Sequence, residues 1–488
     1  MQTVLGVDIG TSSSKGILVT LDGTVVGTAT RNHEVSRPGR GQVEMDADLW
    51  WQEFAAISSE LLTAWSTDVV SVGVSGMGPC VVLADAAGSA LRPAILYGVD
   101  TRATEQISRL TDLLGNQAVV DRCGSALSSQ SVGPKLLWLA ENEPEAMEAT
   151  TYLFMPSSWL GFKLTGAYVL DHHSASQCTP MYDTQSVGWY RPWVDLVAPG
   201  LDLPGLVWPG DIIGTVTDEA SLLTLIPAGV PVVAGTIDAW AEAISVGAQF
   251  TGDLMLMYGT TMFLINTVGE RQTSSTLWGT MGAYPETYSL AGGMATSGAI
   301  TGWLQELLGP ASYPELLLEA EQAGAGSHGL IMLPYFAGER TPIADPDARG
   351  VIAGLTLAHT RGDIYRAVLE ATAFGVRHNI DALRKAGGDI KRIVAVGGGT
   401  QGGLWTQIVS DITGEDQQIP SVTIGASFGV AYLAACAIQK TEIENWNPIS
   451  FTVKPRIGLG GLYSEFYEIY LELYTATSDL MHRLSKFS

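Results

Sequence analysis

The chain has few cysteines and few basic residues, and both shortages exclude classes of protein. It has 4 cysteines in 488 residues, at positions 80, 123, 178 and 436, without CxxC spacing. This scatter argues against a disulfide scaffold or a metal cluster and favours a reduced, cytoplasmic setting. The 26 Lys and Arg residues against 50 Asp and Glu give a net charge of −24. Nucleic acid and anionic membrane surfaces are therefore not expected as partners.

Long uncharged apolar runs and low-complexity tracts are also absent. The chain begins directly in an expected strand, so we expect neither a signal peptide nor a membrane-spanning helix. With 488 residues, 46% of them hydrophobic, and 56 glycines, the composition is typical of a compact soluble enzyme. This length exceeds one ordinary core and predicts two large domains.

The first thirty residues predict two apolar strands joined by a polar turn. Residues 4–7 and 17–21 are apolar, and Gly10-Thr11-Ser12-Ser13-Ser14 lies between them. A third strand is expected over 24–30. A turn between antiparallel strands is neither a P-loop nor a GxGxxG segment that opens a helix. Its N–H and hydroxyl groups can wrap phosphate oxygens, and Asp8 before it can hold hydrated Mg²⁺. An ordinary polar turn is the alternative.

The same pattern returns near the middle of the chain. Residues 254–258 and 262–268 predict strands, and Gly259-Thr260-Thr261 forms the turn between them. Hairpins with Gly-Thr turns are common, so one repeat is weak evidence. Two copies nevertheless suggest two domains built on one plan, at 1–247 and 248–488.

A third glycine cluster follows the expected strand 393–396. Gly397-Gly398-Gly399-Thr400 precedes a predicted helix over 404–412. Glycines let a flat ring and a ribose lie directly on the backbone, so this cluster reads as an adenosine platform. A flexible turn is the alternative.

Other segments predict the framework around these turns. Asp46 is expected to cap a helix that buries Leu49, Trp50, Phe54 and Ile57, and residues 104–114 predict a second helix. Strands are expected at 69–75, 81–84, 94–97 and 230–235, with 81–84 and 94–97 extending the sheet. Asp238 follows the last of these strands and opens a helix over 239–246.

The order of these motifs resembles the FGGY carbohydrate kinases over nearly the whole chain. Gly350–Leu355, seven residues, and then Asp363–Glu370 match the C-terminal signature of that family at every constrained position. The N-terminal signature is matched in part by Pro134–Trp138 and Glu141-Asn142, and Val132 departs from it. The resemblance implies an α/β, two-domain, actin-like (ribonuclease H-like) ATPase fold with an interdomain active-site cleft. It also implies phosphoryl transfer from ATP to a sugar.

The resemblance assigns roles to individual residues. The residues expected to face phosphate are Gly10, Thr11, Ser12, Gly259, Thr260 and Thr261. Those expected to hold adenosine are Gly397, Gly398, Gly399, Thr400 and Gly425. Asp8 would position Mg²⁺, and Asp238 would be the catalytic base, because a sugar hydroxyl is a poor nucleophile until a carboxylate accepts its proton. A helix cap is the alternative for Asp238, and both roles can hold together.

The sugar side follows the family less closely. Leu91–Leu96 resembles the xylulokinases, whereas Ser75-Gly-Met-Gly-Pro-Cys80 stands where they carry SGQMHG. The predicted substrate is a ketopentose such as D-xylulose; ribulose, gluconate, glycerol or erythritol is the alternative, and a non-sugar actin-like ATPase is less favoured. Expected substrate contacts are Met77, Asp100, Arg102 and Asp238, although Asp100 and Arg102 could equally brace their loop. Ligand roles for Lys15, Glu339 and Arg340 stay open, as does the oligomeric state, with a homodimer as one option.

Overall fold

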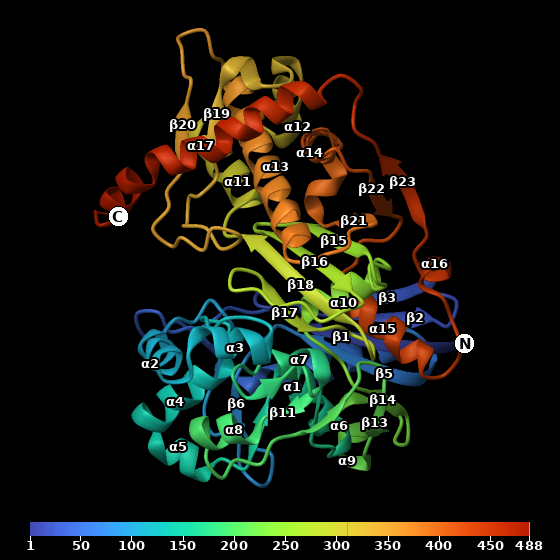
Figure 1. The fold of residues 1–488 in the computed structure, drawn as a ribbon. Helices are drawn as coiled ribbons and strands as arrows, with labels where there is room; N and C mark the ends of the chain where they lie inside the picture. Colours follow the sequence, from blue (N-terminus) through green and yellow to red (C-terminus); the bar gives the residue numbers. More distant parts are fainter. Residues whose placement is uncertain (310, 488) are drawn as a thin grey trace. The chain divides into compact units, whose positions relative to one another are not determined.

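A computed structural model describes residues 1–309 and 311–487, and the chain forms two compact units (Figure 1). Unit one comprises 1–249, 268–289 and 424–448, and unit two comprises the described residues of 250–267, 290–423 and 449–488. Two later segments of the chain therefore return to the first unit. No helix in the described part of the chain is long and apolar enough to cross a membrane.

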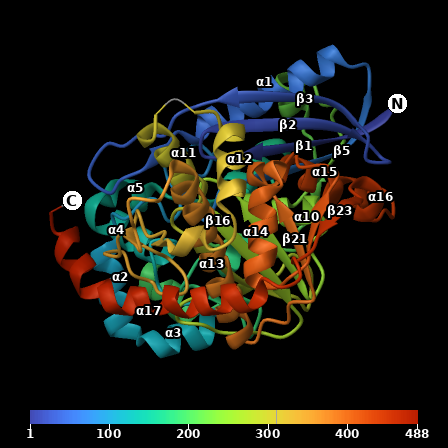
Figure 2. The same ribbon diagram turned by 90° about the horizontal axis from the view of Figure 1, so that it is seen from above.

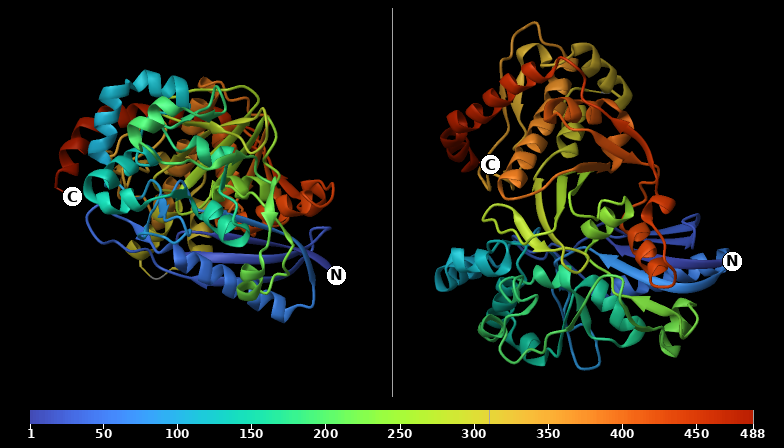
Figure 3. Two further views of the ribbon diagram at one scale, coloured as in Figure 1. Left: turned by 90° about the horizontal axis from the view of Figure 1, so that it is seen from below. Right: turned by 45° about the vertical axis from the view of Figure 1, so that its right-hand side comes forward.

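A six-stranded sheet forms the centre of unit one. Its order is β13 (Ile212–Thr215), β14 (Pro231–Val233), β5 (Asp68–Gly76), β1 (Gln2–Ile9), β2 (Ser13–Thr20) and β3 (Val25–Asn32). The strands β1, β2 and β3 are antiparallel neighbours, and β5 runs parallel to β1 (Figure 3, blue strands). The predicted hairpin with its polar turn is confirmed.

Helices pack on both faces of this sheet, among them α1 (Ala47–Ala64) and α15 (Ala426–Cys436) (Figure 2). On one face, α1 begins at Asp46, whose side chain accepts a hydrogen bond from the N–H of Asp48. The helix buries Trp50, Phe54 and Ile57 as predicted, since these residues recur at helical spacing, whereas Leu49 is only partly buried. On the other face, α15 packs on β1 and β5.

Three glycines let α15 approach the sheet and α10 (Asp238–Ser245) closely. An added Cβ would lie 2.1 Å from the Ser427 oxygen at Gly6, 2.3 Å from the Val430 oxygen at Gly73, and 1.9 Å from the Ala241 oxygen at Gly429. No side chain fits at these separations, so these glycines set the position of α15 and α10.

The prediction that residues 81–84 and 94–97 extend the main sheet is wrong. Strand β6 (Val82–Ala84) pairs with β8 (Tyr152–Phe154), and β7 (Ala94–Ile95) pairs with β4 (Glu44–Met45). The place beside β5 is taken by β14, which comes from much later in the chain. The apolar pattern of 81–84 and 94–97 predicted strands correctly but carried no information on their partners.

A second apolar cluster lies in unit one, and α4 contributes Val132, Leu136 and Leu139 to it. The predicted helix over 104–114 is confirmed as α2. The remaining elements are α2 (Thr104–Leu114), α3 (Asn116–Cys123), α4 (Val132–Asn142), α5 (Pro144–Ala149), α6 (Pro156–Thr165), β9 (Val169–Asp171), α7 (His172–Ser176), β10 (Tyr182–Asp183), β11 (Gly188–Trp189), α8 (Arg191–Val197), β12 (Gly205–Val207), α9 (Asp218–Thr224), β17 (Trp278–Met281) and α16 (Ile443–Trp446).

Unit two is also built on a sheet. It includes, in order, β18 (Tyr288–Met294), β16 (Met262–Val268), β15 (Asp253–Tyr258), β21 (Arg392–Val396), β22 (Gln417–Pro420) and β23 (Ile449–Val453). The antiparallel pair β15 and β16 confirms the second predicted hairpin, and β21 lies parallel to β15. The other elements are α11 (Gly298–Leu307), α12 (Tyr313–Ala323), η1 (Ser327–Gly329), β19 (Ile331–Leu333), β20 (Val351–Ala353), α13 (Arg361–Lys385), η2 (Gly398–Gly402), α14 (Leu404–Thr413) and α17 (Gly460–Ser485).

The C-terminal signature residues stabilise the start of α13. Thr360 and Asp363 form a reciprocal capping box, so the first turn is satisfied locally. Glu370 accepts hydrogen bonds from the Gly326 N–H and the Ser327 hydroxyl at 2.9 Å each, and from Arg366 at 2.8 Å. These fully paired side chains are structural, which explains why the pattern identifies a family without marking its chemistry.

Candidate active site

Asp8 lies at the end of β1, directly opposite Ser75 of the neighbouring strand β5. The Ser75 hydroxyl donates to Asp8 Oδ1 at 2.8 Å. Desolvation by the surrounding protein raises the pKa of Asp8 to about 6, although Ser75 and the Lys15 charge act in the opposite direction. The carboxylate therefore sits where a bound cation would stabilise its charged form.

Asp238 is the first residue of α10, after Ile237 at the N-cap position. Its Oδ1 accepts a hydrogen bond from the Ala239 N–H at 2.7 Å, so the carboxylate also serves the helix end. Desolvation, and secondly the charge of Asp8, raises the pKa of Asp238 to about 7. A carboxylate with a pKa near neutrality is matched to proton transfer at physiological pH.

Glu242 is a member of this group that the sequence analysis missed. It lies four residues after Asp238 on α10, which places both side chains on one face of the helix. Desolvation, then Asp8 and Asp238, raise the pKa of Glu242 to about 7, and Lys15 opposes this shift. The sequence feature that could have identified Glu242 is its i, i+4 spacing from Asp238 in Asp-Ala-Trp-Ala-Glu. The positive charge of Lys15 lowers the pKa of both Asp8 and Glu242, and so opposes the effect of burial on two of these acids.

The donor set of these three acids fits Mg²⁺. Asp8, Asp238 and Glu242 are half-buried; desolvation is the main cause of all three raised pKa values, and the charge of Asp8 further raises the pKa of Asp238 and of Glu242. Hard carboxylate oxygens suit Mg²⁺, which usually keeps several of its waters. Within residues 1–309 and 311–487, no cluster of three or more His, Cys, Asp and Glu has the geometry of a direct metal site. That Asp8 contacts such an ion through water, as the family resemblance implies, stays a prediction.

The first predicted phosphate turn is closed by the Gly10 N–H, which donates to the Ser13 carbonyl at 3.0 Å. The Thr11 hydroxyl lies 3.0 Å from the Tyr97 hydroxyl, and Ser12 is exposed. Lys135 on α4 supports Tyr97, because its ammonium donates to the carbonyls of Leu96 at 2.8 Å and Tyr97 at 3.0 Å. Burial lowers the pKa of Lys135 to about 8. The N-terminal signature lysine therefore orders the loop that contacts the turn.

The second predicted phosphate turn has a helix at its side. The Gly259 N–H donates to the Thr261 carbonyl at 3.1 Å. At the start of α11, the N–H groups of Ser297 and Gly298 donate at 3.0 Å to the carbonyls of Thr260 and Gly259. The Ser297 hydroxyl is buried and has no hydrogen-bond partner among the residues that the structure describes. The turn and the N-terminus of α11 thus form one polar unit, although its phosphate role stays a prediction.

The Gly397–Thr400 segment of unit two is shaped by packing as well as by backbone conformation. Gly397 has φ +99°, and a Cβ at Gly399 would lie 2.8 Å from the Trp405 ring, whereas one at Gly398 would meet nothing within 4 Å. Gly425 (φ +113°) lies in unit one, where an added Cβ would be 3.1 Å from Glu242 Oε2. The adenosine role of these residues stays a prediction.

The predicted sugar-side residues differ in their surroundings. Met77 is buried, and in its loop a Cβ at Gly78 would lie 2.7 Å from the side chain of Ile237, the residue before Asp238. Asp100 and Arg102 form a buried ion pair at 2.7 Å. Asp100 Oδ2 accepts from the Val43 N–H at 2.6 Å, and Arg102 also bonds Glu44 at 2.7 Å and lies 4.9 Å from the Trp138 ring centre. These contacts agree with the alternative interpretation, in which Asp100 and Arg102 stabilise their own loop.

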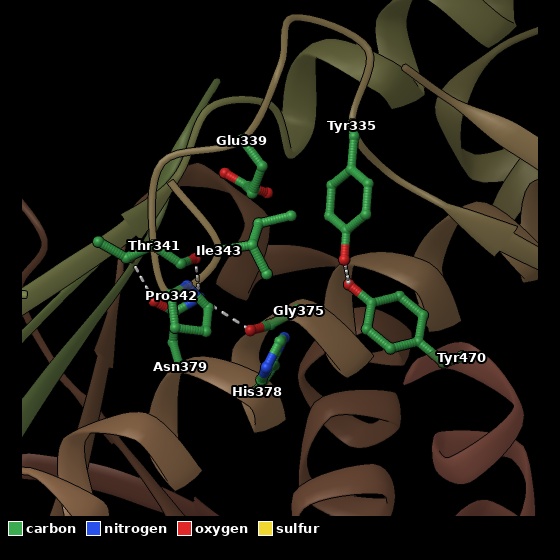
Figure 4. A pocket seen from close by; sticks show the side chains of 9 residues that line it. All are labelled: Tyr335, Glu339, Thr341, Pro342, Ile343, Gly375, His378, Asn379 and Tyr470. Atoms are coloured by element: carbon green, nitrogen blue, oxygen red, sulfur yellow. Dashed lines mark hydrogen bonds between the residues drawn. The ribbon is translucent and has the colours of Figure 1, made fainter. Parts of the chain in front are cut away.

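Glu339 lines a small cavity in unit two (Figure 4). Its carboxylate accepts hydrogen bonds at 2.7 Å from the N–H groups of Ala295 and Arg340. Burial raises the pKa of Glu339 to about 8. Across the cavity, the hydroxyls of Tyr335 and Tyr470 lie 2.8 Å apart. Glu339 is thus a buried anchor for its own loop.

Comparisons with known proteins bear directly on this architecture. Residues 3–245 match the N-terminal domain, and residues 254–438 the C-terminal domain, of the FGGY family of carbohydrate kinases. This chain belongs to the FGGY family. It is therefore an ATP-dependent carbohydrate kinase, and the predictions of family, two-domain fold and enzyme class are confirmed.

Individual relatives of this FGGY kinase carry different substrate names. It is 31% identical over 457 residues to the xylulose kinase of Escherichia coli (strain K12), covering 90% of this chain and 91% of the relative. It is also 31% identical over 459 residues to the glycerol kinase of Renibacterium salmoninarum, covering 90% of each chain. The crystal structure of xylulose kinase from Rhodospirillum rubrum matches with a TM-score of 0.92 and 31% identity, over 98% of this chain and 100% of that chain.

Proposed function

We propose that this kinase transfers the γ-phosphoryl group of ATP to a hydroxyl of a small sugar, with Asp238 as the general base. The observation that carries the proposal is the half-buried Asp238 carboxylate, whose pKa is raised to about 7 by desolvation and by Asp8. Such a carboxylate can accept the proton of a bound hydroxyl as the oxygen attacks phosphorus. Its hydrogen bond to the Ala239 N–H fixes its orientation.

The other polar elements would bind and orient the donor. Asp8 would hold hydrated Mg²⁺, which when bound offsets charge on the phosphates. The Gly10–Ser12 and Gly259–Thr261 turns would direct N–H and hydroxyl groups at phosphate oxygens, and Gly397–Thr400 with Gly425 would receive adenosine. Lys15 would limit repulsion between the acids and the donor, since its charge acts on both Asp8 and Glu242.

For the acceptor, we propose a ketopentose such as D-xylulose. The xylulose kinase names of the Escherichia coli and Rhodospirillum rubrum relatives support this choice. A polyol such as glycerol is the second candidate, because the glycerol kinase of Renibacterium salmoninarum is equally identical. The loop beside Ile237 also contributes a buried Met77 and Cys80, which cannot bind several hydroxyls strongly.

A coupled ADP-release assay with MgATP tests the proposal. The panel is D-xylulose, D-ribulose, glycerol, erythritol and gluconate, each also run with the Asp238→Asn variant. The matched control is Glu219→Gln, an exposed acid in the first turn of α9. We expect the highest kcat/KM with D-xylulose, full dependence of ADP release on the acceptor, and normal activity in the control. A preference for glycerol would replace the ketopentose assignment, and steady ADP release unaffected by any acceptor would contradict sugar kinase chemistry here.

A further inference from the structure

A buried histidine and glutamate lie against the first phosphate turn. His33 follows β3, and Glu53 projects from α1; their side chains are 3% and 9% exposed. The His33 ring bridges two oxygens: Nδ1 lies 2.9 Å from Glu53 Oε2, and Nε2 lies 3.0 Å from the Gly10 carbonyl oxygen. The Ser14 hydroxyl donates to the same Glu53 oxygen at 2.6 Å. We call this arrangement the His33–Glu53 pair.

The partners of the ring determine how many protons the pair holds. A peptide carbonyl only accepts hydrogen bonds, and so does an ionised carboxylate. Nε2 must therefore carry a proton to bond the Gly10 carbonyl, and a second proton must lie between Nδ1 and the Glu53 carboxylate, on either residue. The pair thus holds two protons. The pair then has no net charge. The arrangement therefore brings no negative charge to a turn expected to face phosphate, although it contains a glutamate.

The same contacts orient the peptide groups of the turn. In a trans peptide unit the carbonyl and the N–H point in opposite directions. Because the Gly10 carbonyl points at His33, the Thr11 N–H of that unit points away from the ring. The backbone N–H of His33 also donates to the Ser12 carbonyl at 3.0 Å. His33 thus holds the turn at two carbonyls, that of Gly10 through its ring and that of Ser12 through its backbone N–H.

We propose that His33 is a positioning residue for the nucleotide phosphates: through Gly10 it aims the turn's N–H groups at them, and Glu53 keeps its ring in place. The inference rests on the proposed phosphate role of Gly10–Ser12. It predicts that the pair affects binding of the phosphates and leaves adenosine binding unchanged. A purely structural pair would affect both ligands or neither.

Calorimetric binding of MgADP and of adenosine to His33→Leu, on the full chain, tests this. Loss of a buried hydrogen-bond partner commonly costs enough free energy for at least a tenfold change in affinity, so we expect MgADP to bind about tenfold weaker or worse. Adenosine, which has no phosphate, should bind as in the unmodified protein. The matched control is Arg31→Gln, because the Arg31 side chain on β3 donates to Glu60 of α1 at 2.6 Å and to the carbonyls of Thr30 and Ala56.

Further variants separate position from charge. In Glu53→Gln, a neutral His33 can accept from the amide and still donate to Gly10, so MgADP affinity should stay within about threefold. His33→Leu alone leaves the Glu53 carboxylate without its histidine partner. The double variant His33→Leu/Glu53→Gln removes that charge, and its MgADP affinity should remain as low as in His33→Leu. Recovery of MgADP affinity in the double variant, or unchanged affinity in His33→Leu, would overturn the positioning role. Failure of the unmodified protein to bind MgADP would instead refute the proposed function.

Discussion

Replacing Asp238 by asparagine should remove activity and at the same time stabilise the fold. The amide keeps the shape and can still accept the Ala239 N–H bond, so the start of α10 is preserved. It cannot accept the hydroxyl proton, and loss of a general base commonly costs about 10²–10⁴-fold in rate, or about 3–5 kcal/mol of barrier. The fall should appear in kcat, with the affinity for MgADP nearly unchanged.

The stability gain follows from the direction of the pKa shift. The pKa of Asp238 is raised from 3.8 to about 7 in the folded protein. Well below pH 3.8 the carboxyl is protonated in both states and contributes nothing; as pH rises, the unfolded chain ionises first, so the folded state loses stability until about pH 7. The full shift corresponds to a ceiling of about 4 kcal/mol. The side chain is half-buried and shares its shift with Asp8, so we expect a gain of about 1–3 kcal/mol at pH 8.

Thermal and urea unfolding at pH 8 and pH 5 measure this gain, with Glu219→Gln as the reference. At pH 8 the free energy of unfolding of Asp238→Asn should be larger than that of the reference and of the unmodified protein. At pH 5 this difference should be smaller. The kcat/KM of the unmodified enzyme should rise with pH through about 7, because only the ionised carboxylate is a base. A variant that is inactive but no more stable at pH 8 would refute the desolvation argument. Near-normal turnover would remove Asp238 from the chemistry.

Three further predictions concern its neighbours. Asp8→Asn should raise the Mg²⁺ concentration needed for half-maximal activity and lower kcat, since an amide lacks the charge that orders the waters of the ion; identical Mg²⁺ titrations would contradict this. Gly429→Ala should destabilise unit one by about 1–3 kcal/mol or more, because its methyl group would overlap the Ala241 carbonyl, and unchanged unfolding would show that α10 and α15 separate freely. Arg102→Leu should lower the melting temperature as well as activity, since it leaves Asp100 buried and unpaired; lost sugar affinity at unchanged stability would favour direct substrate contact.

The sequence by itself determined the local elements and their order. The hairpins at residues 2–20 and 253–268, the helix after Asp46 and the placement of Asp238 where a strand gives way to a helix all follow short-range patterns. Three features, namely apolar alternation, turn residues and helix caps, depend on residues that are neighbours in the chain. They can therefore be interpreted without knowing which other segment packs against them. The family signatures are also continuous stretches of sequence, and they cover most of α4, strand β20 and the first part of α13.

Only the tertiary structure decided which elements meet. Residues 81–84 were expected to extend the main sheet, but strand β14 is the one that pairs with β5. Helix α15 belongs to unit one although it lies far along the chain. Glu242 joins the site because α10 packs against α15 at Gly429, and His33 reaches Glu53 across β3 and α1. Such contacts depend on close approach between distant segments, where one glycine or one buried charge changes the outcome. A pattern of neighbouring residues does not contain that information.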